Sequence, residues 1–307
     1  MNIYNDIYQI PKQNRIIVLG NFDGVHQGHR QLLACGKALA SQHKMELMVL
    51  TFYPQLQEIF HEEFRYLLSQ RVKMHILKVL GIDTVLALPF NEDIAKMSPE
   101  AFVKEILLQS LGAQFVVVGF NYTFGYRGAG TAENLKSLTA SAGVETVVVE
   151  PVYVDKELVS STAIRTMLQE GRLEKVNEFL GYPFMLDGTV VHGHHVGRTM
   201  GIPTANLQVD SKVALPMRGV YAVEVWLTGR HFLGVLNVGM RPTVDNGTDT
   251  SVEVHILDFD EDIYGEYVLV SIHHYLRGET KFDSLEQLKE QIARDMDKTR
   301  ALLAKIN

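Results

Sequence analysis

The amino-acid sequence predicts two domains: an α/β domain with a Rossmann-like parallel sheet, then a small antiparallel β-barrel with a C-terminal helix. Up to about residue 150, short β-branched segments alternate with helical segments, which is typical of a parallel sheet buried on both faces. Beyond residue 183, short strands separated by turn residues follow one another directly, which indicates a small barrel or sandwich. We therefore expect domains at residues 1–182 and 183–307, with the boundary near residues 181–185.

The expected elements of the first domain follow the apolar pattern. Its strands are the apolar runs at residues 16–22, 47–52, 84–88, 115–118 and 145–149. Its helices are expected between these runs, at residues 30–43, 70–80, 99–111 and 133–142, with a further helical stretch at 160–181. Ser98 before Pro99 is a typical helix N-cap, and helix ends are followed by Gly81, Gly112 and Gly143.

The second domain is expected to contain strands at residues 189–193, 219–227, 231–239, 250–257 and 266–276. A C-terminal helix follows, because apolar residues recur on one stripe, at Leu285, Leu288, Ile292, Met296 and Leu303. Ser284 and Gln287 have the spacing of a capping box at its start.

The composition is that of an ordinary globular protein, with 46% apolar and 21% charged residues. The formal net charge of −7 disfavours a large nucleic-acid surface, since such binding depends on cations that neutralise phosphates. The single cysteine, Cys35, cannot form an intramolecular disulfide, so a reducing compartment is expected. No apolar run reaches the roughly 18 residues that cross a bilayer. We expect a cytoplasmic protein without nucleic-acid or membrane partners, as a monomer or weak homo-oligomer.

The first motif, VLGNFDGVHQGHR, joins an apolar strand to a helix. Its His26 and His29 flank the helix N-terminus at the carboxyl end of a parallel strand, where open α/β sheets bind ligands and free backbone N–H groups favour phosphate. Two imidazoles on one turn can donate hydrogen bonds to a phosphate whose charge grows in a transition state. A two-histidine zinc site and a purely structural turn are the alternatives.

Two further segments are expected at the same edge of the sheet. The sequence SSTAIR, from Ser160 to Arg165, places three hydroxyls and an arginine at the start of a helix. The hydroxyls either cap the helix or bind phosphate, and Arg165 favours phosphate because its guanidinium can chelate one. The segment Val118–Arg127, which contains Asn121, again follows a strand and so opens at the same edge.

In this order, GNFDGVHQGH, GFNYTFG and SSTAIR resemble the adenylyltransferase half of the bacterial bifunctional riboflavin kinase/FAD synthetase family. The resemblance implies an HxGH nucleotidyltransferase domain in which His26 and His29 stabilise the α-phosphate and the leaving pyrophosphate of ATP. It implies that Phe124 lies near the flavin. It also implies that Asn121 helps to bind ATP or the flavin, and that ATP and its phosphates are bound by Asn21, Phe22, Asp23, Gly24, Gly28, Ser161, Thr162 and Arg165, the last with a catalytic role.

Two segments depart from the family's pattern. The family's Phe-x-Pro-His/Gln-Pro is Phe-Tyr-Pro-Gln-Leu at residues 52–56, so Leu56 replaces a proline. The family's Asp-Phe-Arg-Phe-Gly is Asn-Tyr-Thr-Phe-Gly at residues 121–125, so Thr123 replaces an arginine. Both changes concern the flavin more than the chemistry on ATP. An enzyme in which only the riboflavin kinase half is active is therefore the nearest alternative.

The second domain carries GTVVHGHHVGRTMGIPTAN near its start. Gly193 and Gly197 permit a polyphosphate to approach the backbone closely, beside Arg198, and tight turns are the alternative. Thr204 and Asn206 offer two oxygens two residues apart in an extended segment, which suits Mg²⁺ shared with substrate phosphates.

Further along, residues 251–257 alternate, so that apolar side chains share one face of a strand and Glu253 and His255 share the other. A carboxylate that points into a site can act as general base for a hydroxyl nucleophile, whereas a solvent-facing glutamate is the alternative.

The segments PTAN, GVYAV, LNVGMRPT and VEVHILDF, in that order, resemble the riboflavin kinase module. The resemblance implies that Thr204 and Asn206 bind Mg²⁺ with ATP, that Glu253 activates the ribityl 5′-hydroxyl, and that Arg277 lies near the flavin. The expected substrates are riboflavin, FMN and ATP: riboflavin becomes FMN in the C-terminal domain, and FMN becomes FAD with release of pyrophosphate in the N-terminal domain. A non-catalytic flavin- or nucleotide-binding regulatory protein is the alternative from another class.

Overall fold

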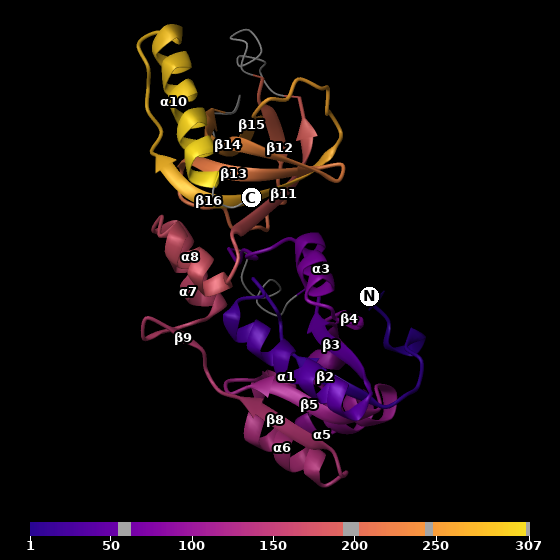
Figure 1. The fold of residues 1–307 in the computed structure, drawn as a ribbon. Helices are drawn as coiled ribbons and strands as arrows, with labels where there is room; N and C mark the ends of the chain where they lie inside the picture. Colours follow the sequence, from indigo (N-terminus) through magenta and orange to yellow (C-terminus); the bar gives the residue numbers. More distant parts are fainter. Residues whose placement is uncertain (55–62, 193–202, 243–247, 305–307) are drawn as a thin grey trace. The chain divides into compact units, whose positions relative to one another are not determined.

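The structure is a computed structural model that describes residues 1–54, 63–192, 203–242 and 248–304. Two compact units divide the chain: residues 1–64 with 73–161, and residues 65–72 with 162–307. The first contains a parallel sheet and the second a closed barrel (Figure 1). The expected boundary near residues 181–185 marks the change from helices to antiparallel strands, and it stays a prediction.

A six-stranded sheet forms the first unit, in the order β1-β4-β3-β2-β5-β8, and every neighbouring pair is parallel. Its strands are β1 (Asn2–Tyr4), β2 (Arg15–Leu19), β3 (Glu46–Phe52), β4 (Thr84–Leu88), β5 (Ala113–Gly119) and β8 (Glu145–Val149). All five residues of β2 are buried, as expected for a central parallel strand. The parallel sheet predicted from the apolar runs is confirmed, and β1 was missed because three residues are too few to show a period.

Helices connect the strands of this unit (Figure 1). They are η1 (Ile7–Gln9), α1 (Gln27–His43), α3 (Gln70–Val79), α4 (Glu92–Lys96), α5 (Pro99–Ala101), η2 (Phe102–Ser110), η3 (Tyr126–Gly128) and α6 (Ala132–Ala140). The single helix expected at 99–111 is wrong in detail, since α5 continues into η2, a π-helix. Its predicted cap is confirmed: the Ser98 Oγ accepts a hydrogen bond from the Ala101 N–H at 3.2 Å. Two short strand pairs complete the unit, β6 (Thr123–Phe124) with β7 (Gly130–Thr131) and β9 (Tyr153–Val154) with β10 (Glu157–Leu158).

The second unit is a closed antiparallel barrel in the order β11-β12-β15-β14-β13-β16, which decides between the barrel and the sandwich. Two helices, α7 (Ser161–Gln169) and α8 (Leu173–Leu180), precede it in the chain. Its strands are β11 (Phe184–Val191), β12 (Ala205–Gln208), β13 (Gly219–Leu227), β14 (Arg230–Pro242), β15 (Thr248–Ile256) and β16 (Tyr267–Arg277).

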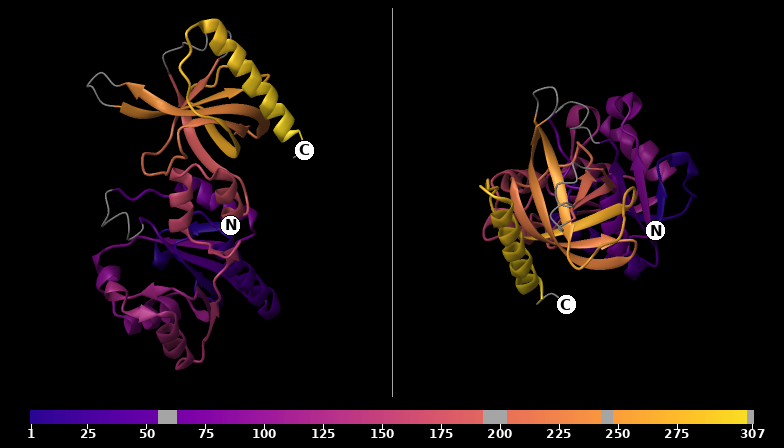
Figure 2. Two further views of the ribbon diagram at one scale, coloured as in Figure 1. Left: turned by 90° about the vertical axis from the view of Figure 1, so that its left-hand side faces the viewer. Right: turned by 90° about the horizontal axis from the view of Figure 1, so that it is seen from above.

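The C-terminal helix α10 (Leu285–Leu303) packs against β13, β14 and β16 (Figure 2). The expected apolar stripe is partly wrong, because Leu285 is 56% exposed while Asp295 is 3% exposed. Asp295 is buried because it forms an ion pair with Arg277 of β16, Nη2 to Oδ2, at 2.9 Å. The Ser284 Oγ caps the helix by accepting from the Gln287 N–H, but the Gln287 side chain accepts from Asp283 and so does not close the expected capping box.

A buried ion pair anchors the start of β2. Arg15 is 1% exposed, and its Nε lies 2.5 Å from the Glu46 Oε2 on β3. Its other donors reach the carbonyl oxygens of Pro11 and Leu111 at 2.6 and 3.2 Å. Burial alone would raise the pKa of Glu46, but hydrogen bonds from Thr84, Arg15 and other donors outweigh it and hold the pKa of Glu46 below its usual value.

We predict that Arg15→Met lowers the free energy of unfolding by about 3 kcal/mol at neutral pH. The substitution leaves the Glu46 carboxylate without its ion-pair partner and the Pro11 and Leu111 carbonyls without their donor. The pKa of Glu46 is lowered in the folded wild-type protein, so the stability that the ion pair contributes is lost as the pH falls through this pKa. The difference in the free energy of unfolding between Arg15→Met and wild type therefore becomes smaller at low pH. Urea unfolding followed by circular dichroism measures both effects. The exposed Lys12→Met is the control, and equal midpoints for the two variants would contradict the prediction.

Candidate functional site

The first site lies where the strand order of the parallel sheet reverses. The chain leaves β2 and continues to β3 on one side, while β5 lies on the other side of β2. The histidine-containing segment follows β2, and the segment with Asn121 follows β5, so both lie at the carboxyl edge of adjacent strands. Open α/β sheets bind ligands at this kind of crevice. The predicted placement of these two segments at one edge is confirmed.

The turn between β2 and α1 has a backbone conformation that is unfavourable for two of its side chains. Phe22, Gly24 and Val25 have φ angles of 52°, 81° and 38°. Glycine adopts a positive φ freely, but other residues pay roughly 1–2 kcal/mol, and β-branched valine is a clear outlier there. β2 consequently ends at Leu19 rather than at the predicted Phe22. Such strain persists only where surrounding contacts hold it.

Three side chains from other elements hold this turn through its backbone carbonyls. The Asn21 carbonyl accepts from the Thr51 Oγ1 at 3.1 Å and from the Lys73 Nζ at 3.4 Å. The Asp23 carbonyl accepts from the Ser161 Oγ at 2.8 Å. Ser161 is the first residue of α7, so this hydrogen bond brings the start of the serine-rich segment to the histidine turn, and its binding of phosphate stays a prediction.

His26 and His29 face each other across the first turn of α1. His26 is the N-cap, and its Nδ1 accepts from the His29 N–H at 3.3 Å. The rings stack with centroids 3.7 Å apart and an interplanar angle of 19°. A side chain at Gly28 would place its Cβ 3.1 Å from the His26 Cε1, so glycine leaves room for the folded-back ring. Because its Nδ1 accepts this hydrogen bond, a neutral His26 carries its proton on Nε2. The Nε2–H can then donate a hydrogen bond to a ligand.

His29 is half-buried, and two other rings lie close to its own. The centroid of the Phe22 ring is 5.1 Å away with the ring planes tilted by 43°, and the His26 ring stacks on it. Burial lowers the pKa of His29 well below 6.5, and the neighbouring His26 and Lys73 lower it further. His29 is therefore neutral at pH 7. Within the part of the chain that the structure describes, its Nδ1 is buried without a hydrogen-bond partner.

The other predicted residues of this site differ in exposure. Asn121 and Thr162 are exposed, and Arg165 is half-buried on α7. Two predicted residues have buried side chains: Phe22 is fully buried beside His29, and Phe124, 6% exposed, packs in the core against the Phe102 ring at 5.6 Å. Their expected contacts with ATP and with the flavin stay predictions. The substitution at Leu56 lies outside the described residues.

The zinc alternative needs further ligands near the two histidines. Among the described residues, no three His, Cys, Asp or Glu side chains gather in an arrangement that could hold a metal ion. The half-buried ring of His29 instead suits hydrogen bonding to an anion.

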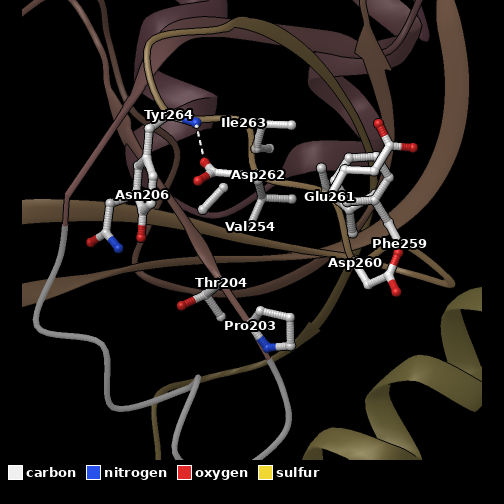
Figure 3. Close-up of a pocket in the computed structure, with 12 residues that line it drawn as sticks. Pro203, Thr204, Asn206, Val254, Phe259, Asp260, Glu261, Asp262, Ile263 and Tyr264 are labelled. Atoms are coloured by element: carbon white, nitrogen blue, oxygen red, sulfur yellow. Dashed lines mark hydrogen bonds between the residues drawn. The ribbon is translucent and has the colours of Figure 1, made fainter.

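The second site is a pocket of about 200 Å³ at one end of β12 and β15. Thr204 and Asn206 both line it, together with Asp262 and Tyr264 from the loop before β16. Figure 3 shows these side chains around the pocket, with the hydrogen bond from the Tyr264 N–H to the Asp262 Oδ1 at 3.1 Å. Thr204 and Asn206 thus lie at one pocket, and their binding of Mg²⁺ stays a prediction.

Glu253 is placed by the strand register. It pairs with Asn206 on β12 and with Asn237 on β14, and residues directly opposite each other in an antiparallel pair project to the same face. Two amide side chains therefore flank the carboxylate. On the same strand, the His255 Nδ1 donates to the Pro203 carbonyl at 2.8 Å, which ties the segment before Thr204 to β15. Gly193, Gly197 and Arg198 lie outside the described residues.

Arg277 ends β16, where its guanidinium is held by α10. Its Nε lies 2.9 Å from the Asp295 Oδ2, and its Nη1 donates to the Gly278 carbonyl at 3.1 Å. The Gln291 side chain donates to the same carboxylate at 3.0 Å. Its expected position near a flavin stays a prediction.

Sequence reasoning missed three groups at these sites. Lys73 was passed over as an ordinary helix lysine, although buried Val72 and Leu77 around it signal a covered helix face. Asn237 was missed because only the strand register places it opposite Glu253. The pocket residues at 259–264 stood in a turn-rich segment with no strand period.

Comparison with known proteins finds one family match in each half of the chain. Residues 9–163 match the FAD synthetase family, and residues 180–303 match the riboflavin kinase family. A bifunctional riboflavin kinase/FMN adenylyltransferase of Listeria monocytogenes is 36% identical over 296 residues, 95% of this chain and 94% of that protein. Proteins of the same description from Escherichia coli and Bacillus subtilis are 36% and 34% identical, over 95% and 91% of this chain and 93% and 90% of theirs.

A solved structure has the same fold. A crystal structure from Streptococcus pneumoniae, described as that of a macrolide-efflux protein, is 33% identical and superposes with a TM-score of 0.87 over 97% of this chain and 98% of that one. None of the helices in the described ranges is long and apolar enough to cross a membrane.

We predict that the His29 imidazole becomes protonated only well below pH 6.5 in the folded protein. Protonation would place a cation in a buried site beside Lys73, so the stability that neutral His29 contributes above pH 6.5 is lost as the pH falls through its lowered pKa. Proton NMR over a pH series measures this, with His29→Gln to assign the resonance. Titration of that resonance at 6.5 or above would contradict the prediction.

Proposed function

The chain belongs to the family of bifunctional riboflavin kinase/FMN adenylyltransferases, and we propose that each reaction takes place at one of the two sites described above. The C-terminal domain phosphorylates riboflavin with ATP to FMN, and the N-terminal domain adenylylates FMN to FAD with release of pyrophosphate. The observation that carries this assignment is that both family matches fall on one chain, each on its own site. The kinase-only and non-catalytic alternatives are not favoured, because both catalytic domains are present. The macrolide-efflux description of one similar structure has no counterpart in either family match.

In adenylyl transfer, a phosphate oxygen of FMN attacks the α-phosphorus of ATP, and the bond to pyrophosphate breaks. Negative charge grows on the α-phosphate and on the leaving group, and donors fixed in advance stabilise it most. The stacked pair of His26 and His29 supports this role, since its orientation is set by the capping hydrogen bond and the Phe22 ring. Ser161, Thr162 and Arg165 on α7, with Asn21, Asp23, Gly24 and Gly28 of the turn, would hold the remaining phosphates and the nucleotide.

In the kinase reaction, Glu253 would take the proton of the ribityl 5′-hydroxyl as that oxygen attacks the γ-phosphorus, and ADP leaves. The half-buried position of Glu253 between Asn206 and Asn237 supports this role, since both amides can orient a carboxylate or a hydroxyl. The neutral oxygens of Thr204 and Asn206 in one pocket fit a hard cation that is shared with phosphates. When bound there, Mg²⁺ would neutralise charge on the transferred phosphate.

The enzyme's substrates imply where it works. We propose a cytoplasmic protein, since ATP is its co-substrate and its one cysteine, Cys35, forms no disulfide. That it is a monomer or weak homo-oligomer without nucleic-acid or membrane partners is likewise a proposal.

We expect the purified protein, incubated with riboflavin, ATP and Mg²⁺, to form FMN first and then FAD. The order follows from FMN being the product of one site and the substrate of the other. Chromatographic separation of the flavins over time measures it. FMN without FAD would remove the adenylyltransferase assignment, and unchanged riboflavin would remove both.

We further expect two substitutions to separate the reactions. His29→Ala removes one phosphate donor and should slow FAD formation from FMN by about 100-fold or more. Glu253→Gln removes the base and should slow FMN formation from riboflavin by about 100-fold or more. Each variant is the other's control, because each should keep the reaction of its intact domain. Loss of both reactions in either variant would show that the two sites are not independent.

A further inference from the structure

A buried lysine that the proposed reaction does not use lies beneath the first site. Lys73 is on α3 and only 2% exposed. Removing an ammonium from water costs several kcal/mol unless its contacts compensate. An unbranched apolar side chain such as methionine would fill a similar space without that cost, so packing does not account for a lysine at this position.

The contacts of Lys73 are with the strained turn between β2 and α1. Its Nζ lies 3.4 Å from the Asn21 carbonyl oxygen, the group that also accepts from Thr51. Burial lowers the pKa of Lys73 to about 8, and attraction to Asp23 opposes this decrease, so the ammonium form prevails at pH 7. Asp23 is 4% exposed and belongs to the same turn. A charge held between these groups stabilises the turn at the two residues on either side of Phe22.

The same ammonium acts on the histidine pair. The charged and titratable groups that act on the half-buried His29 are His26 and Lys73, and both lower its pKa. His29 also rests on Phe22, whose φ of 52° depends on the turn. The Lys73 side chain thus stabilises the turn that positions Phe22 beside His29, and it favours the neutral form of the His29 ring.

We propose that Lys73 is a positioning residue for adenylyl transfer, which holds the Asn21–Asp23 turn so that the stacked His26 and His29 stand ready for the phosphates of ATP. The proposal rests on the function proposed for that site. Lys73 itself is covered by protein and does not touch the substrates. Its contribution is to the geometry of the reacting groups, and an error of about 1 Å in such geometry can cost about 100-fold in rate.

The test compares Lys73→Met, which keeps the length and removes the charge, with Lys73→Arg, which keeps the charge. Lys78→Met, an exposed lysine at the end of the same helix, is the matched control. FAD formation from FMN is measured at saturating and limiting ATP over a pH series. Riboflavin phosphorylation is measured in the same preparations, and the His29 titration is followed by NMR.

We expect Lys73→Met to lower kcat for FAD formation roughly tenfold to 100-fold while riboflavin phosphorylation is unchanged. The His29 titration, and the limb of the pH–rate profile that reports it, should move to higher pH, since a neighbouring cation is gone. Lys73→Arg should restore part of kcat, and Lys78→Met should behave as wild type. A role in packing alone would shift neither titration nor pH profile.

Three results overturn the proposal. They are wild-type kcat for FAD formation in Lys73→Met, an unmoved His29 titration in that variant, or equal losses in Lys73→Arg and Lys73→Met. If Lys73→Met does not fold, the Lys73→Arg titration and rate decide in its place. Failure of the wild-type protein to form FAD would instead remove the proposed function, so the two failures are distinguishable.

Discussion

The first site depends on a turn whose backbone has to be held against its own preference. Two non-glycine residues, Phe22 and Val25, stand at positive φ in the short connection from β2 to α1. The turn buries Phe22 under His29 and brings His26 to the helix N-terminus, where it caps α1 and stacks on His29. Hydrogen bonds from Thr51, Lys73 and Ser161 reach it from three other elements. The site is thus assembled by tertiary contacts rather than by the motif alone.

The second site is fixed in a different way, by strand register. Asn206, Glu253 and Asn237 lie on three neighbouring strands and come to one face because each faces the next directly. A shift of one residue in either pairing would turn Glu253 away from its neighbours, since side chains alternate along a strand. The hydrogen bond from His255 to the Pro203 carbonyl adds a contact between β15 and the segment that leads into β12.

Much of this architecture follows from local patterns. The apolar runs predicted the longer strands of the parallel sheet, and the turn-rich segments predicted the barrel. The strand–turn–helix order predicted that His26 and His29 lie at the carboxyl edge of the sheet. Exposure within the site was not predictable: the side chains of Phe22 and Phe124 pack inward, and the sequence of a motif does not distinguish a buried aromatic residue from an exposed one. Lys73 and Asn237 were missed for the converse reason, because only tertiary contacts bring them to the sites. The burial of Asp295 was also not predicted, because its ion-pair partner, Arg277, lies on a strand that is distant in the sequence.

Closure of the barrel limits how this domain can associate with other chains. A sheet that closes on itself leaves little strand edge among the described residues for a second polypeptide to extend through backbone hydrogen bonds. The parallel sheet does have edges, at β1 and β8, and β1 is only three residues long, which leaves little backbone for such pairing. An assembly through the barrel is therefore expected to be built mainly from side chains, so that its strength follows the composition of the barrel's outer face and of α10.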